Sequence, residues 1–412
     1  MSEATPGAAA ETSRWLSFDG VPPGALVLLA GAWLLSLVTQ GFIIIPASIV
    51  DQITAATGVD DATAVWLVSA TPGAWAASNF MVGTVIDRWG DVRVTAAGTA
   101  LFVATAVWCF LAARRGDFAS LLAARIVAGV AIGAIWTAGA NLVGRAFPAA
   151  TSGTAIGVFT ASAPAGFAVT QVSTPPLSAA AGWPAPFALY AALSVFGFAA
   201  FRYGVGRTDP APPDHDTSVG ADFSAVLRNR AVVLGSVMAF AAYSLYLFLN
   251  SWLPSYLSAT FPITASTSGL IAALFPVMGV LSRSGGGVLS DRLFGGNRLG
   301  VLRLSFLLAS PVVALMVVTS RLAVVVALLI VAGFTIQLSF GVVYAYVREA
   351  VTEDISGTAL SVLGTAGIAG AFTAPLVAGA LIDASGAYTT AFGYAVALGV
   401  VGLALTAVAP DS

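Results

Sequence analysis

Two arginines lie inside long apolar stretches of this chain, where their charge requires an explanation. Arg125 and Arg283 each stand within a run of residues typical of a lipid-buried helix, and neither run carries an evident acidic partner. A charge at membrane depth costs a few kcal/mol or more and marks a functional site unless something compensates it. Because a guanidinium group binds carboxylates and other oxyanions through a planar fork of N–H donors, the two arginines favour a site for a small anion. The alternatives are a structural or gating role for Arg125, and snorkelling of Arg283 toward water or bonding to backbone carbonyls.

Other polar and aromatic residues near the middle of the apolar runs are candidates for lining a substrate pathway. Asn and Gln in such places otherwise hydrogen-bond to a neighbouring helix. The candidates are Gln40, Asn79, Trp136, Asn141, Gln171, Tyr243, Tyr246, Asn250 and Gln337.

A short motif occurs twice in the chain, and each copy ends an apolar run. The copies are 204 residues apart (287 minus 83), close to half of the 412 residues, so they predict two similar halves. The members are Gly83, Asp87, Arg88, Gly90 and Arg93 in the first copy, and Gly287, Asp291 and Arg292 in the second.

The repeated motif has the chemistry of a contact between two helical halves. We expect Gly83 and Gly287 to let another helix approach closely. Asp87 and Asp291 would accept charge-assisted hydrogen bonds from arginines or helix N-termini of the other half, which would latch one global state. The alternative is that these charges only mark which loops stay on one side of the membrane.

Composition indicates a membrane protein, since 58% of the residues are hydrophobic and 9% are charged, against roughly 25% charged in soluble domains. Runs of about 20 apolar residues span a bilayer as helices. The chain therefore predicts an all-α membrane protein with twelve transmembrane helices in two pseudo-symmetric six-helix bundles. The predicted spans are 24–48, 62–86, 94–113, 119–145, 153–177, 185–201, 232–257, 266–290, 301–319, 322–347, 357–382 and 388–409. The predicted domains are a disordered cytoplasmic tail (1–23), an N-terminal bundle (24–202), a cytoplasmic linker (203–230) and a C-terminal bundle (231–412).

The arginines also predict orientation. Twelve of them fall in the tail and the loops after even-numbered spans, and three fall on the other side. The positive-inside rule then places both termini in the cytoplasm, in a multi-pass protein of the plasma membrane.

The motifs together resemble those of the major facilitator superfamily. Its G-x-x-x-D-R-x-G-x-x-R signature, between helices 2 and 3, matches the first copy, and the second copy matches more weakly. A second superfamily motif in helix 4 matches Arg125, Gly129 and Gly133, and the segment Asn250-Ser-Trp-Leu-Pro254-Ser-Tyr-Leu is similar to organic-anion and cyanate-type members. The resemblance implies transport by alternating access, with a site between the two halves. Pro254 would kink its helix and free a backbone carbonyl near the external gate.

We therefore expect a secondary transporter of a small solute, an organic anion in the favoured interpretation. One rival is a proton-coupled drug or metabolite efflux antiporter, which would require a titratable acid on the pathway. A rival of another class is a non-transporting membrane sensor or scaffold. An enzyme is disfavoured because the single Cys109 and the single His215 build no cluster of nucleophile, base and metal ligands. We expect no cofactor, metal or nucleic-acid partner and a monomer in the lipid bilayer, and we leave the coupling ion open.

Overall fold

The computed structural model describes residues 21–208, 223–293 and 295–410, except for the side chains of residues 149–150, 223, 284–293 and 354. All regular structure in these ranges is helical. The elements of the first half are α2 (Pro23–Ile44), η2 (Pro46–Ser48), α3 (Val50–Thr57), α4 (Asp61–Ala64), α5 (Trp66–Trp89), α6 (Asp91–Arg114), α7 (Phe118–Ala146), α8 (Ala149–Thr160), α9 (Ser162–Ala181) and α10 (Ala185–Val205). Those of the second half are α11 (Phe223–Arg228), α12 (Arg230–Thr260), α13 (Ala265–Ala272), α14 (Leu274–Leu293), α15 (Arg298–Val318), α16 (Leu322–Glu349), α17 (Glu353–Ser385) and α18 (Tyr388–Val408).

The predicted fold class is confirmed. Every predicted span coincides with helical structure, but four spans are divided: the first into α2 and η2, the second into α4 and α5, the fifth into α8 and α9, and the eighth into α13 and α14. Eleven helices in the described ranges are long and apolar enough to cross a membrane. Helix α5 is not one of them; it carries the polar residues Ser69, Thr71, Ser78 and Asn79. Its contacts with α17 give α5 a face turned toward protein rather than lipid.

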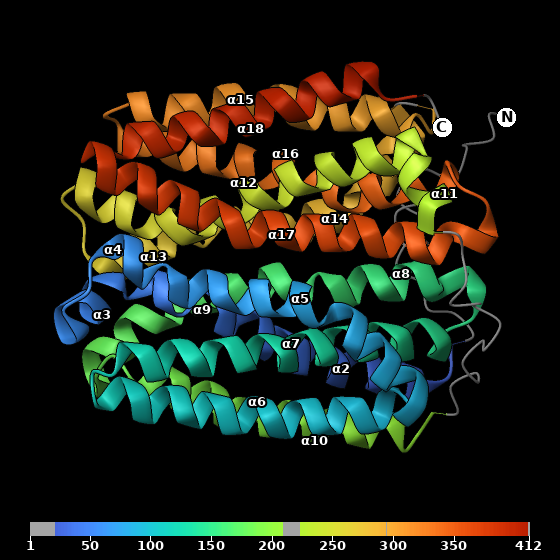
Figure 1. Cartoon of the computed structure of the whole chain (residues 1–412), viewed down its shortest axis with the longest axis horizontal. Coiled ribbons are helices and arrows are strands. Elements are labelled where there is room, and N and C mark those ends of the chain that lie inside the picture. The colour runs from blue at the N-terminus through green and yellow to red at the C-terminus, as the bar shows by residue number, and fades with distance from the viewer. Residues whose placement is uncertain (1–20, 209–222, 294, 411–412) are drawn as a thin grey trace, which may run out of the picture.

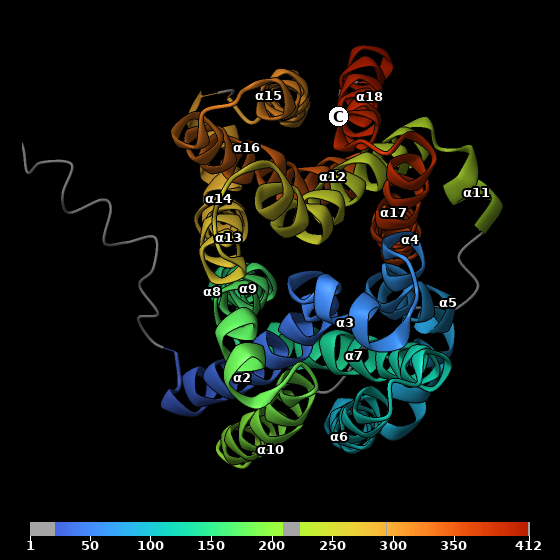
Figure 2. The same cartoon turned by 90° about the vertical axis from the view of Figure 1, so that its left-hand side faces the viewer.

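The helices form two groups that lie side by side (Figure 1). α2 and α5–α10 pack together in one group, and α12–α18 pack together in the other. Seen end-on, the groups meet where α5 lies beside α17 and α9 lies beside α13 (Figure 2). The axis between the halves is therefore bordered by these helices.

The two ends of the molecule differ in charge. Arg145, Arg207, Arg230 and Arg348 lie at the ends of α7, α10, α12 and α16 on one side, which we call the arginine-rich end. α3, α4 and α13 lie at the opposite end (Figure 1). Bonds from Arg230 and Tyr346 to the carbonyls of Val408 and Pro410 place the end of α18 at the arginine-rich end as well.

The halves are closed against each other at the opposite end. The ring of Phe372 on α17 lies 6.1 Å from that of Trp66 on α5, and a Cβ on Gly73 would collide with Phe372. A Cβ on Gly269 of α13 would likewise collide with the carbonyl oxygen of Gln171 on α9. A cavity lined there by η2, α5 and α12 has a volume of only about 10 Å³. Small residues thus allow the close approach that shuts this end.

Candidate substrate site

Arg125 is completely buried, and its guanidinium group is held by backbone carbonyls. Its Nε donates to the carbonyl of Leu67, Nη1 to that of Phe42 and Nη2 to that of Ile43, each at 2.7 Å. The guanidinium carbon also lies 4.7 Å from the centre of the Phe42 ring. In this conformation Arg125 fastens α7 to α2 and α5.

The local sequence explains why these carbonyls are available. Pro46 has no N–H, so the carbonyl of Phe42 lacks its usual helical donor four residues later. Phe42 and Ile43 are also the last turn of α2, where the helix dipole concentrates negative partial charge. The end of α2 therefore compensates the charge of Arg125 without a carboxylate.

Arg283, on α14, has a different environment. Its guanidinium carbon lies 4.4 Å from the centre of the Phe340 ring on α16 and 5.1 Å from that of Tyr246 on α12. Its Nε is buried with no hydrogen-bond partner among the described residues. The hydroxyl of Tyr246 is close to the same guanidinium, also buried and without a hydrogen bond of good geometry. Aromatic faces stabilise a cation by about 0.5–2 kcal/mol and leave its N–H donors free for an anion.

Two further sequence candidates lie beside this cluster. The ring of Tyr243 is 4.3 Å from that of Phe340. Gln337, one turn before Phe340 on α16, is fully buried and donates from Nε2 to the carbonyl of Phe275, while its Oε1 has no partner among the described residues. Arg283, Tyr243, Tyr246 and Gln337 are thus brought together by three helices of the second half.

Asn250, also predicted at the site, lies where the two halves touch. Nε2 of Gln171 on α9 donates to its side-chain Oδ1 at 3.1 Å and to its backbone carbonyl at 3.3 Å. That carbonyl is free because Pro254, four residues later, has no N–H. Pro254 was predicted to free a backbone carbonyl, and the carbonyl that it leaves without a helical donor, that of Asn250, accepts a hydrogen bond from Gln171 of the other half. One turn away on each helix, the ring of Tyr246 stacks on that of Phe167 at 5.3 Å.

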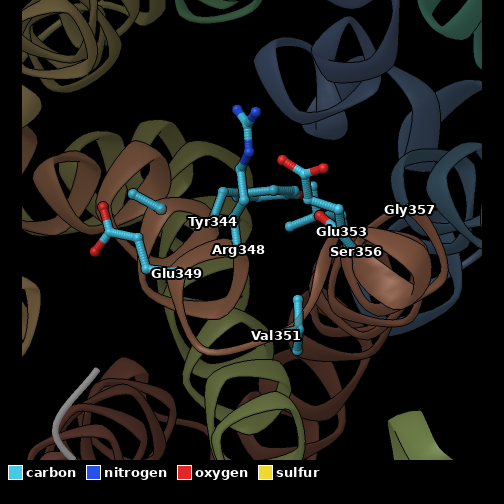
Figure 3. Close-up of a pocket in the computed structure, with 9 residues that line it drawn as sticks. Tyr344, Arg348, Glu349, Val351, Glu353, Ser356 and Gly357 are labelled. Atoms are coloured by element: carbon cyan, nitrogen blue, oxygen red, sulfur yellow. The ribbon is translucent and has the colours of Figure 1, made fainter.

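A cavity of about 770 Å³ opens at the arginine-rich end, between α16 and α17. Figure 3 shows Arg348 and Glu353 projecting into it, whereas Glu349 points to one side, where it pairs with Arg298 at 2.9 Å. Tyr344 also lines the cavity. Phe340, Tyr344 and Arg348 are four residues apart and share one face of α16, about 6 Å per step, so this face runs from the Arg283 cluster to the cavity mouth.

The remaining candidates lie elsewhere in the first half. Trp136 is half-buried between the rings of Trp75 at 6.0 Å and Phe159 at 5.0 Å. Asn79 is half-buried on α5, and Gln40 is buried on α2 with its Nε2 unpartnered among the described residues. No described contact joins any of these three residues to Arg283.

The first copy of the repeated motif is described in full. Gly90 has a φ of 78° and ends α5, which explains a glycine at this tight turn. Asp87, Arg88 and Arg93 are exposed. A Cβ on Gly83 would meet nothing within 4 Å, so the close helix approach expected at Gly83 is wrong for this conformation. The side chains of Asp291 and Arg292, and Gly287 with them, lie outside the described residues.

The buried acid of this loop is one that the signature does not include. Asp91, at the first turn of α6, is 4% exposed and pairs with Arg145 of α7. It also accepts a hydrogen bond from Asn141 Nδ2 at 3.1 Å. Asn141 therefore belongs to a charged cluster at the arginine-rich end and does not lie near the middle of the membrane. Its role in lining a pathway stays a prediction.

Sequence reasoning did not single out Phe340, Phe167, Tyr344 or Glu353. Apolar and aromatic residues carry no distinctive signal in a chain that is mostly hydrophobic. Phe340 and Tyr344 could have been found by extending the face of Gln337 along its helix at spacings of three and four residues.

The fold and the site define a class: a multi-pass helical membrane protein with two bundles and polar groups between them. A model of the Major Facilitator Superfamily matches residues 28–367 and 248–411, and the chain belongs to this family. Members of the family are transporters, not enzymes, as the sequence predicted.

Relatives and solved structures agree with this assignment. The chain is 26% identical over 344 residues to a hexuronate transporter of Bacillus subtilis (strain 168), covering 77% of this chain and 78% of the relative. It is 26% identical over 321 residues to a nitrite extrusion protein of the same organism, covering 76% of each. The fold matches a bacterial homologue of the human lysosomal transporter Spinster, in an inward-facing and unoccupied conformation, with a TM-score of 0.79 and 15% identity over 95% of this chain and 98% of that one.

Proposed function

We propose that this chain is a secondary transporter of a small organic anion, which binds at Arg283 between the two halves and crosses the membrane by alternating access. Support comes from the contrast between the two intramembrane arginines. Arg125 has its charge compensated by the end of α2, whereas Arg283 lies against the rings of Phe340 and Tyr246 and has an unpartnered Nε among the described residues. A bound anion would supply the missing partner.

The names of the relatives point in the same direction. A hexuronate and nitrite, the solutes in those names, are both anions. The rival antiporter would carry a titratable acid on its pathway. The acids that line the described cavity, Glu349 and Glu353, lie at its mouth and not beside Arg283.

We further propose that the arginine-rich end faces the cytoplasm, since basic residues are retained on that side of the plasma membrane. The described conformation would then be closed toward the outside and open toward the cytoplasm. Exposure of Asp87 fits this state, because the latch expected of the repeated motif would form only when the cytoplasmic end closes.

The test is uptake by proteoliposomes that contain the purified full chain, with a panel of labelled carboxylates, neutral solutes and cations. We expect uptake of carboxylates only. Arg283→Ala should abolish uptake, and Arg283→Lys should weaken it because the ammonium keeps the charge but loses the planar fork. Arg114→Ala, which removes an exposed arginine over the Phe110 ring, is the matched control and should transport normally. Normal uptake by folded Arg283→Ala, or a preference for cations, would refute the anion proposal.

A further inference from the structure

The aromatic side chains near Arg283 restrict the shape and polarity of the substrate, in addition to its charge. Five aromatic rings form a connected wall, and two of them, Phe340 and Tyr246, lie against the guanidinium group. The Tyr246 ring lies 5.3 Å from Phe167, 5.9 Å from Phe275 and 5.4 Å from Phe340. Tyr243 completes the wall at 4.3 Å from Phe340. The rings come from both halves, since Phe167 belongs to α9 and the others to α12, α14 and α16.

The charge that this wall can accept is small. Among the described residues, Arg283 is the one cation in contact with this wall, and Arg125 is engaged by carbonyls of α2 and α5. A second negative charge on the ligand would face aromatic rings, whose faces are themselves negative. The cluster therefore suits a monoanion better than a dianion.

The hydrogen-bonding capacity of the wall is also small. The Tyr246 hydroxyl, Gln337 Oε1 and Gln171 Oε1 lack partners among the described residues, whereas Gln171 Nε2 donates to Asn250 Oδ1. A ligand with several hydroxyl groups would leave most of them without partners, and each unsatisfied buried group costs about 1–3 kcal/mol. A planar or apolar body would instead pack on the rings, as aromatic pairs do.

We propose that the substrate is a monoanion with a planar apolar body, an aromatic or unsaturated monocarboxylate, whose carboxylate binds Arg283 while its body packs on Phe340 and Tyr246. This inference rests on the proposed function and specifies it further. Tyr344 and Arg348 line the cavity, and Phe340 lies one turn from Tyr344 on the same face of α16, so this face would be the route from the cavity to the wall.

The experiment measures ligand-dependent thermal stabilisation of the full chain purified in detergent. The probes are benzoate, glucuronate, nitrate, phthalate and the neutral benzyl alcohol. We expect benzoate to reach half-maximal stabilisation at a concentration about tenfold or more below that of the other four, because only it offers both one charge and an apolar ring. Phe340→Leu keeps the position apolar but removes the ring, so it should weaken benzoate binding about two- to tenfold and leave nitrate unchanged. Leu329→Val, a substitution on α16 outside the wall, is the control for packing and should bind benzoate like the unchanged chain.

The possible results separate this inference from the proposed function. Arg283-dependent binding of glucuronate, nitrate or phthalate as tight as that of benzoate would overturn the aromatic-body inference and leave anion transport intact. Benzoate binding that persists in Arg283→Ala, or benzyl alcohol binding as tightly as benzoate, would overturn both. Absence of benzoate stabilisation in the millimolar range would also overturn the inference.

Discussion

The side-chain amide of Gln171 on α9 donates to Oδ1 of Asn250 on α12 at 3.1 Å, and this hydrogen bond joins the two halves of the protein. Both residues are fully buried. Because the same amide also reaches the Asn250 carbonyl freed by Pro254, one glutamine satisfies two acceptors across the interface. The contact lies one turn from the Phe167–Tyr246 stack, on the side of the closed end, and would have to break for that end to open.

Loss of this bond should favour opening at the opposite end. Gln171→Leu keeps the approximate volume and removes a hydrogen bond with a net value of about 0.5–1.5 kcal/mol. We expect a cysteine introduced at Ser255, which lines the small closed cavity, to react about two- to tenfold faster with a membrane-impermeant maleimide in Gln171→Leu. The background should carry Cys109→Ala.

Gln52→Leu is the matched control for that experiment. Gln52 donates to Ser178 at 3.0 Å, but both residues belong to the first half, so its loss should leave labelling at position 255 unchanged. Equal acceleration by both substitutions would indicate general loosening of the protein rather than a contact that closes one state.

Arg125 should be a determinant of folding. Arg125→Met would leave the buried carbonyls of Phe42, Ile43 and Leu67 without these donors, at about 1–3 kcal/mol for each group left unsatisfied. We expect a large loss of folded protein and a lower melting temperature by fluorescence-detected size exclusion. Arg125→Lys, with a single ammonium, should have a melting temperature between those of Arg125→Met and the unchanged chain. Arg114→Met should melt like the unchanged chain. A stable Arg125→Met protein that fails only in transport would instead support direct substrate contact by Arg125.

The two acids near the first motif should behave differently. Asp91→Asn removes the charge that pairs with Arg145 and should lower stability by about 1.5–3 kcal/mol, the range for hydrogen bonds to charged groups. Asp87→Asn changes an exposed side chain and should leave the melting temperature of this conformation unchanged, while slowing transport if Asp87 latches the alternative state. Thermal melting and uptake, measured on both variants, separate the two roles. Unchanged uptake in Asp87→Asn would reduce that residue to a topology marker.

Substitution of a glycine by alanine should destabilise the protein in one superfamily motif and not in the other. A Cβ on Gly129 of α7 would collide with the carbonyl oxygen of Thr71 and approach Ala74 at 2.9 Å on α5. Gly129→Ala should therefore force α5 and α7 apart and lower the yield of folded protein. Gly83→Ala adds the same methyl group where this conformation leaves open space, so its stability should not fall. Equal melting temperatures for the two variants would contradict the close α5–α7 packing.

Several features of this protein could be predicted from local sequence. The membrane helices other than α5 follow from runs of apolar residues, because lipid supplies no hydrogen bonds and the backbone must satisfy itself within the helix. The pseudo-repeat follows from the recurrence of one motif, and the turn at Gly90 from a backbone angle that glycine adopts without strain. The family can also be recognised from the sequence, since its motifs are short and contiguous.

The role of each charge was decided by residues far away in the chain. Arg125 and Arg283 look alike in sequence, but one carbonyl that compensates Arg125 belongs to Phe42, 83 residues away, and can accept from it because α2 ends there and Pro46 has no N–H. Arg283 meets Phe340 and Tyr246 from two other helices instead. Likewise Asp91 and not Asp87 is buried, because α6 and α7 bring Arg145 and Asn141 to it. The apolar pattern determined the membrane-spanning segments other than α5. Only tertiary packing decided which charges are already compensated, because compensation depends on distances between helices that no local pattern records.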